Sequence, residues 1–75
     1  METVGERLRW ARERQLLTQE ALAARAGVLD VTISRTENGH TTPTVGTLRK
    51  LADALGVDPV WLRFGEGEPW GEAAA

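Results

Sequence analysis

The chain has 75 residues, the length of one domain, and carries nine basic and eleven acidic side chains for a net charge of −2. The absence of cysteine excludes a disulfide framework and a thiolate metal site, and one histidine cannot hold a metal alone, so we expect no metal and no cofactor. Because the sequence contains neither an 18-residue apolar run nor a signal-like segment, we expect a soluble cytoplasmic protein with no membrane partner.

Residues 3–15 have the pattern of an amphipathic helix. Thr3 and Glu6 have the spacing of a capping box at its start. The residues that then recur every three or four positions are Val4, Leu8, Ala11 and Arg12. The basic residues that fall off this stripe are expected to be exposed, and they are Arg7, Arg9 and Arg14.

Residues 17–39 read as two short helices joined by a turn. Thr18 is a suitable N-cap for a helix from Gln19 to Arg25, and Gly27 stands where that helix must stop. A second helix starts at Leu29 or Asp30, and it ends at Glu37 before Asn38-Gly39. Two helices around a tight turn form the outline of a helix-turn-helix, which fits the major groove of DNA.

Two further helices follow a loop over residues 40–43. Thr44 caps one helix, which Gly56 ends, and Asp58-Pro59 begins a last helix that runs to about Phe64. The sequence therefore predicts an all-α fold of five helices without a strand. The predicted core consists of Leu8, Ala11, Leu22, Ile33, Leu48, Leu51, Leu55 and Leu62, with Trp61 either in that core or at a dimer interface.

The last residues differ in composition from the rest. Glycine, proline and glutamate dominate residues 66–75, so we expect a flexible acidic tail after a helix-turn-helix domain over residues 1–65. Glu66, Glu68 and Glu72 account for the acidic excess, which leaves nine basic and eight acidic groups, a net of +1, in residues 1–64. Trp70, the only large apolar group of the tail, either belongs to a frayed end or docks on the domain or on a partner subunit.

Three segments together resemble the phage repressor and Cro type of helix-turn-helix, the Xre family. They are RLRWARERQLLTQEALAARAGV, TISRTENG and TPTVGTLRKLADALGVDPVWLRFGEGEP, and the match covers about residues 3–67. The resemblance implies a lambda-repressor-like domain of bacterial or phage origin, associated with the nucleoid. It also implies a transcriptional regulator, most simply a repressor, that binds a near-palindromic operator as a dimer with its third helix in the major groove.

The third helix supplies the candidate base contacts. Ile33 is its one large aliphatic residue that should face inward, which leaves Asp30, Val31, Ser34 and Arg35 facing outward. Arg35 suits guanine O6 and N7 but is also compatible with an exposed ion-pairing arginine, and Val31 either meets a thymine methyl group or is inert. Asp30 accepts from a cytosine amino group, repels phosphate, or caps its helix.

By resemblance, a second set of polar residues contacts the DNA backbone, and it consists of Thr18, Gln19, Asn38, His40, Thr41 and Thr42. The family also suggests an ion pair between Arg12 and Glu37. The position of Arg12 favours the same pair, because Arg12 shares a helix face with Leu8 and Ala11, and a charge on an apolar helix face needs a partner. The alternative is two separately solvated side chains.

Four residues depart from the family pattern. Leu16 stands where glycine often ends the first helix, and Leu29 replaces the usual Ser or Thr cap of the third helix. Thr36 replaces a large inward-facing aliphatic residue, and Gly46 lies in the first turn of the fourth helix, where it should cost about 1 kcal/mol relative to alanine.

Pairing of two copies would use apolar residues around the last helix, and the candidates are Val57, Val60, Trp61, Phe64 and Trp70. The alternative function is a protein-interaction module that kept the fold but lost most DNA affinity. An enzyme is not expected, because no nucleophile–base pair, metal cluster or phosphate-binding glycine loop is present. Nor does the sequence indicate a small-molecule ligand.

Overall fold

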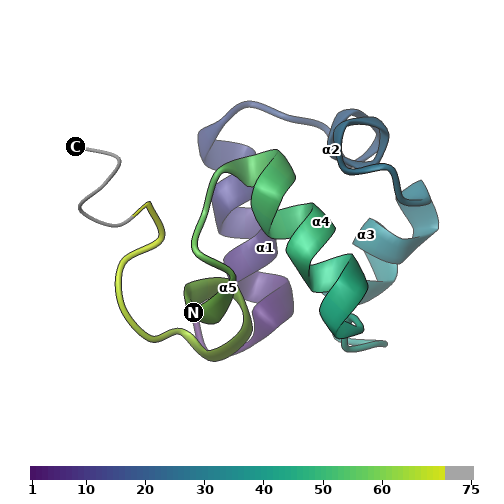
Figure 1. Cartoon of the computed structure of the whole chain (residues 1–75). Helices are drawn as coiled ribbons and strands as arrows, with labels where there is room; N and C mark the ends of the chain where they lie inside the picture. Colours follow the sequence, from purple (N-terminus) through teal and green to yellow (C-terminus); the bar gives the residue numbers. More distant parts are fainter. Residues whose placement is uncertain (71–75) are drawn as a thin grey trace.

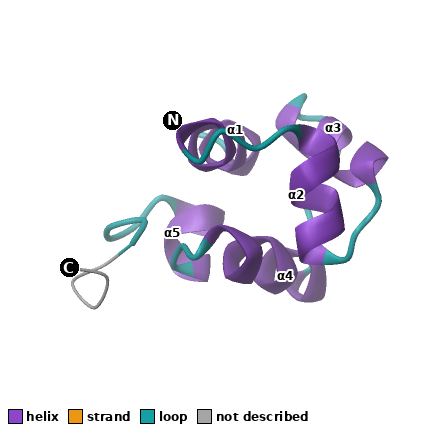
Figure 2. Ribbon diagram, turned by 90° about the horizontal axis from the view of Figure 1, so that it is seen from above, coloured by secondary structure: helices purple, strands orange, loops and turns teal. Residues whose placement is uncertain are grey.

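Five helices follow one another in the predicted order. The structure, a computed structural model, describes residues 1–70. The helices are α1 (Val4–Arg14), α2 (Gln19–Ala26), α3 (Asp30–Glu37), α4 (Val45–Leu55) and α5 (Pro59–Phe64). Residues 1–70 contain no strand, which agrees with the all-α prediction. Figures 1 and 2 show α1 on one side of the molecule and α4 with α5 on the opposite side, while α2 and α3 close one end.

Local hydrogen bonds start and stop most helices where the sequence predicts. Thr3 forms the capping box with Glu6, and the Thr18 hydroxyl accepts from the backbone of Ala21 at 3.0 Å. Helix α3 is the exception, because its N-cap is Leu29 and no side chain caps it. The alternative that Asp30 caps this helix is therefore wrong, since Asp30 is already its first helical residue.

The core lies between the five helices and contains every predicted apolar residue. All eight predicted side chains are buried, and Val57 and Trp61 are buried with them at 6% and 5% exposure. Trp61 thus belongs to the core of the single chain. Neither Val57, which precedes α5, nor Trp61, which belongs to it, offers free surface to a second copy, because both are buried.

Arg7 corrects the expectation that it is exposed, because only 4% of the residue is accessible. Its guanidinium donates to the backbone oxygens of Leu62 and Arg63 at 2.8 Å each, and to that of Met1 at 3.0 Å. The last carbonyl groups of a helix lack partners within the helix and carry the negative end of its dipole. The C-terminal turn of α5 therefore serves as the partner of this buried cation.

The segment after α5 returns to the domain. The backbone N–H of Asp58 donates to the carbonyl oxygen of Pro69 at 2.7 Å. The rings of Trp70 and Trp10 lie 5.5 Å apart, and those of Trp10 and Trp61 lie 5.7 Å apart. Trp70 therefore packs on its own domain, while the last residues of the predicted tail, 71–75, lie outside the described residues.

Gly5 lets α1 approach the end of α3. A Cβ atom on Gly5 would overlap the carbonyl oxygen of Thr36 and would lie 3.1 Å from the Cα of Glu37. Thr36 is only 1% exposed, so it faces inward as its larger family counterparts are expected to do. This close approach brings α1 within reach of the Glu37 side chain.

We expect Gly5→Ala to destabilise the protein by about 1–3 kcal/mol, because the added methyl group meets backbone that cannot move without separating the two helices. Gly46→Ala is the matched control, since a Cβ there meets nothing within 4 Å. This control should stabilise α4 by about 0.5–1 kcal/mol. Urea denaturation of both variants tests the pair, and an unchanged midpoint for Gly5→Ala would contradict the close contact.

Candidate nucleic-acid interface

An open groove runs between the N-terminal ends of α2 and α3. Its volume is about 650 Å³. The residues that line it are Arg12, Thr18, Gln19, Glu20, Asp30, Val31 and Ser34. The fold thus brings the start of both helices of the helix-turn-helix to one surface, as base reading by α3 requires.

The candidate base contacts divide into two groups. Asp30 and Val31 are exposed and line the groove together with the half-buried Ser34. Arg35 is exposed on the same helix but does not line the groove. Ile33 is fully buried, which agrees with the prediction that it faces inward from α3.

The candidate backbone contacts also divide. Thr18 and Gln19 lie in the groove, whereas Asn38 ends α3 and is exposed. The loop after α3 is exposed as well, and it carries His40, Thr41 and Thr42. Of the six candidates, only Thr18 and Gln19 therefore line the groove.

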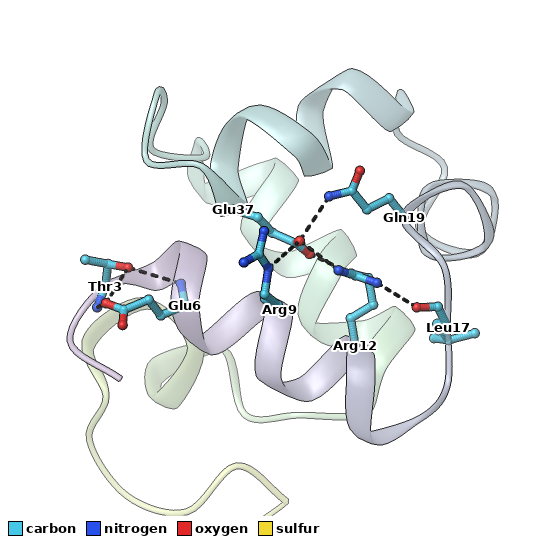
Figure 3. A network of polar contacts seen from close by, with 7 residues as sticks. All are labelled: Thr3, Glu6, Arg9, Arg12, Leu17, Gln19 and Glu37. Carbon is cyan, nitrogen blue, oxygen red and sulfur yellow. Dashed lines mark hydrogen bonds and ion pairs between the residues drawn. The ribbon is translucent and has the colours of Figure 1, made fainter.

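The predicted ion pair lies at this groove, which Arg12 lines. Arg12 donates from Nε to Glu37 Oε2 at 2.7 Å and from its second terminal nitrogen to Oε1 at 2.9 Å (Figure 3). The Glu37 side chain has no accessible surface, and that of Arg12 is 11% exposed. The remaining terminal nitrogen of Arg12 donates to the carbonyl oxygen of Leu17 at 2.8 Å. The two side chains are thus not separately solvated.

Two further donors complete this network, and neither was predicted from the sequence. Arg9 donates from Nε to Glu37 Oε1 at 3.3 Å, and Gln19 donates from Nε2 to the same oxygen at 3.0 Å (Figure 3). Arg9 lies three residues before Arg12, so their shared helix face was a usable signal. No local pattern indicates Gln19, because it comes from a different helix.

The network decides the charge of Glu37. Burial raises the pKa of this carboxyl, but hydrogen bonds from Arg12 and Gln19, with the Arg12 charge, outweigh burial and hold the pKa below its ordinary value. The same hydrogen bond to Glu37 raises the pKa of Arg12. Both groups therefore stay charged at neutral pH.

A second groove, of about 290 Å³ and largely apolar, lies between α4 and α5. Its lining residues are Pro43, Val45, Leu48, Arg49, Pro59, Val60, Arg63 and Phe64. Val60 and Phe64 are 47% and 62% exposed, so they are the candidate pairing residues that remain free on α5.

No helix among residues 1–70 is long and apolar enough to cross a bilayer.

We expect Glu37→Ala to cost about 3–5 kcal/mol of unfolding free energy, because Arg12 would keep its charge in a mostly buried place without a partner. Since folding lowers the Glu37 pKa, its contribution is present above the ordinary carboxyl pKa and is lost as the pH falls toward the lower folded value. Thermal denaturation from pH 7 down to pH 3 measures both effects.

The control for this substitution is Glu13→Ala, which removes an exposed carboxylate from the same helix as Arg12. It should change stability by less than about 1 kcal/mol. Equal melting temperatures for Glu37→Ala and the parent protein would dispose of the structural role of the ion pair.

Known proteins are similar to this chain in both sequence and fold. PrtR, an HTH-type transcriptional regulator of Pseudomonas aeruginosa, is 41% identical over 73 residues, which are 97% of this chain and 28% of PrtR. RghR, an HTH-type transcriptional repressor of Bacillus subtilis, is 43% identical over 68 residues, 89% of this chain and 50% of RghR. The chain therefore spans half or less of the length of these curated relatives.

Among solved structures, the P22 c2 repressor in complex with a synthetic operator superposes with a TM-score of 0.82 at 35% identity. The superposition covers 88% of this chain and all of that one. A helix-turn-helix family model matches residues 8–62, which include all of α2, α3 and α4 and most of α1 and α5. The chain belongs to the helix-turn-helix family of Xre type, whose members include these transcriptional regulators.

Proposed function

We propose that this chain is a sequence-specific DNA-binding transcriptional regulator, and specifically a repressor. The observation that carries the proposal is the groove at the start of α2 and α3, where residues suited to base and phosphate contacts share one surface. A repressor with 35% identity and the same fold is solved on an operator, and a relative of 43% identity is called a repressor. Both support this function.

In the proposed complex, α3 lies in the major groove. Asp30, Val31, Ser34 and Arg35 then face base edges, and Arg35 forms two parallel hydrogen bonds to guanine. The backbone contacts come from Thr18 and Gln19 at the start of α2, from Asn38 at the end of α3 and from His40, Thr41 and Thr42 in the loop that follows.

We further propose that two copies bind one near-palindromic operator. A single module covers about half a turn of DNA, so two copies with their α3 helices about 34–36 Å apart supply the needed specificity. The apolar groove beside α5 supports this pairing, because Val60 and Phe64 leave large apolar surface uncovered there.

A regulator of this kind acts on the chromosome and thus in the bacterial cytoplasm. The proposal includes no catalysis, cofactor or small-molecule ligand.

One observation favours a second function, a protein-interaction module. Glu20 and Asp30 both line the groove, and carboxylates there repel phosphate. The two functions predict different results in a DNA-binding assay. A DNA-binding regulator forms a complex with DNA at low salt, and the affinity of that complex falls as the salt concentration rises, whereas an interaction module forms no such complex.

Selection of bound sequences from a random DNA pool, followed by a salt titration on the winning site, tests the proposal. We expect a symmetric consensus and an affinity that falls as salt rises. The absence of DNA binding by the parent protein at low salt would favour the interaction module.

Arg35→Ala should weaken binding to the selected site by about 1–3 kcal/mol, relax the preference at one guanine and leave nonspecific binding nearly intact. Arg35→Lys should rescue only part of the loss, because an ammonium group lacks the planar fork of a guanidinium. Electrophoretic mobility shifts on selected and random duplexes measure both.

Arg14→Ala is the matched control, because it also removes one positive charge, but from α1 and not from α3. The Arg14 guanidinium lies 4.8 Å from the centre of the Trp10 ring. This variant should leave the base preference unchanged. Equal losses on selected and random DNA for Arg35→Ala would assign Arg35 to the phosphates instead.

Phe64→Gln should weaken self-association by about 2 kcal/mol or more, because it removes the largest exposed ring of the apolar groove. Leu16→Asn is the control, since Leu16 is 93% exposed but lies in the turn between α1 and α2. Sedimentation equilibrium, free and on operator DNA, reads out both variants. A parent protein that stays monomeric at high concentration and on DNA would contradict the dimer.

A further inference from the structure

Arg7 joins the start of α1 to the last turn of α5. Its Nε donates to the carbonyl oxygen of Leu62 and one terminal nitrogen donates to that of Arg63, both at 2.8 Å, while the other terminal nitrogen donates to that of Met1 at 3.0 Å. The fit is close, because a Cβ atom on Gly65, the C-cap of α5, would lie 3.0 Å from a terminal nitrogen of Arg7. Since a guanidinium holds its donors in a rigid planar fork, these contacts fix where the end of α5 lies relative to α1.

The charge of Arg7 is compensated by carbonyl groups alone. Among residues 1–70, no carboxylate pairs with Arg7, and both ion pairs there belong to Glu37. Burial and the nearby charge of Arg63 lower the pKa of Arg7, but an arginine keeps its charge in proteins. Replacement of buried charged groups by well-packed apolar residues is often neutral or stabilising. Stability alone therefore does not account for a buried cation at this position.

The turn that Arg7 binds also carries part of the apolar groove between α4 and α5. Phe64, the last residue of α5, lines this groove together with Val60 and Arg63. The carbonyl oxygen of Arg63 accepts from Arg7, and the guanidinium of Arg63 lies 5.0 Å from the centre of the Phe64 ring. Because a helix of six residues is not stable on its own, the positions of Val60 and Phe64 depend on tertiary contacts such as these.

We propose that Arg7 is a positioning residue for the pairing of two copies. It holds the last turn of α5 so that Val60 and Phe64 present one apolar surface, and at 4% exposure it is too buried to contact the second copy itself. The inference rests on the proposed pairing through α5, and it adds a residue of α1 to the determinants of that surface. Without Arg7, α5 keeps its apolar side chains but loses the contacts that orient them.

Arg7→Met tests this role, because methionine keeps an unbranched apolar stem and removes every donor. Sedimentation equilibrium is run at a temperature and sucrose concentration at which circular dichroism shows parent and variant to be folded. The dissociation constant of the pair should rise by about 10-fold or more. Arg7→Lys, which keeps the charge, is the second variant, and it should lose part of the pairing because an ammonium group lacks the planar fork.

DNA binding separates positioning from a general loss of structure. A duplex with one half-site of the selected sequence needs one copy, whereas the full operator needs two. Arg7→Met should bind the half-site as the parent protein does and lose affinity only for the full operator. A role of Arg7 in stability alone would not produce this difference, since both duplexes would report the same folded fraction.

Gln15→Ala is the matched control. Gln15, the C-cap of α1, also donates to a carbonyl group at the end of a helix, that of Leu55 in α4, at 2.7 Å. Neither Gln15 nor Leu55 lines the apolar groove. Loss of this contact should lower stability and leave the dissociation constant of the pair unchanged.

Phe64→Gln supplies a second check, because Arg7 is proposed to act through the turn that carries Phe64. In the Phe64→Gln background, Arg7→Met should add little to the loss of pairing. Residues that act through one contact surface have effects that do not add, and a double-mutant cycle measures the difference.

An unchanged dissociation constant of the pair in folded Arg7→Met would overturn the inference. So would equal losses on the half-site and the full operator, or fully additive losses in the double variant. A parent protein that stays monomeric, free and on DNA, would instead refute the proposed pairing itself.

Discussion

Glu37 carries a negative charge into a place where its side chain has no contact with water, and the cost of that burial is met by four hydrogen bonds. The donors come from α1 and from the first residue of α2, while the carboxylate comes from the last residue of α3. Removal of one partner of a buried pair leaves an uncompensated charge, which is why such pairs fix geometry more than they add stability. This one group therefore links α1 to both helices of the helix-turn-helix.

The same network shapes the electrostatics of the surface. The chain has nine basic residues, but three of them, Arg7, Arg9 and Arg12, donate hydrogen bonds to partners within the fold. Fewer cations are then free to replace counterions on DNA, and nonspecific affinity depends on such replacement. In the proposed complex, discrimination would therefore come mainly from base contacts in the groove and from pairing of two copies.

Helix α5 is only six residues long, and its position depends on contacts at both of its ends. At its C-terminus the buried Arg7 binds the carbonyl groups of Leu62 and Arg63, and at its N-terminus Asp58 bonds to Pro69. With α5 in this position, Trp61 lies in the core while Val60 and Phe64 are exposed. The apolar face proposed for pairing thus lies on a helix held by polar contacts at both ends.

The sequence by itself determined the features that depend on near neighbours. The capping box of Thr3, the left-handed Gly27 and Gly56, and the buried helix stripes follow from interactions over a few residues, and so the elements and core were predictable. Only the tertiary structure decided the partners of Arg7, which lie as far as 56 residues along the chain, and of Gln19, which lies 18 residues away. Buried polar groups take whatever acceptor the packing brings to them, and helical periodicity cannot name an acceptor on another helix.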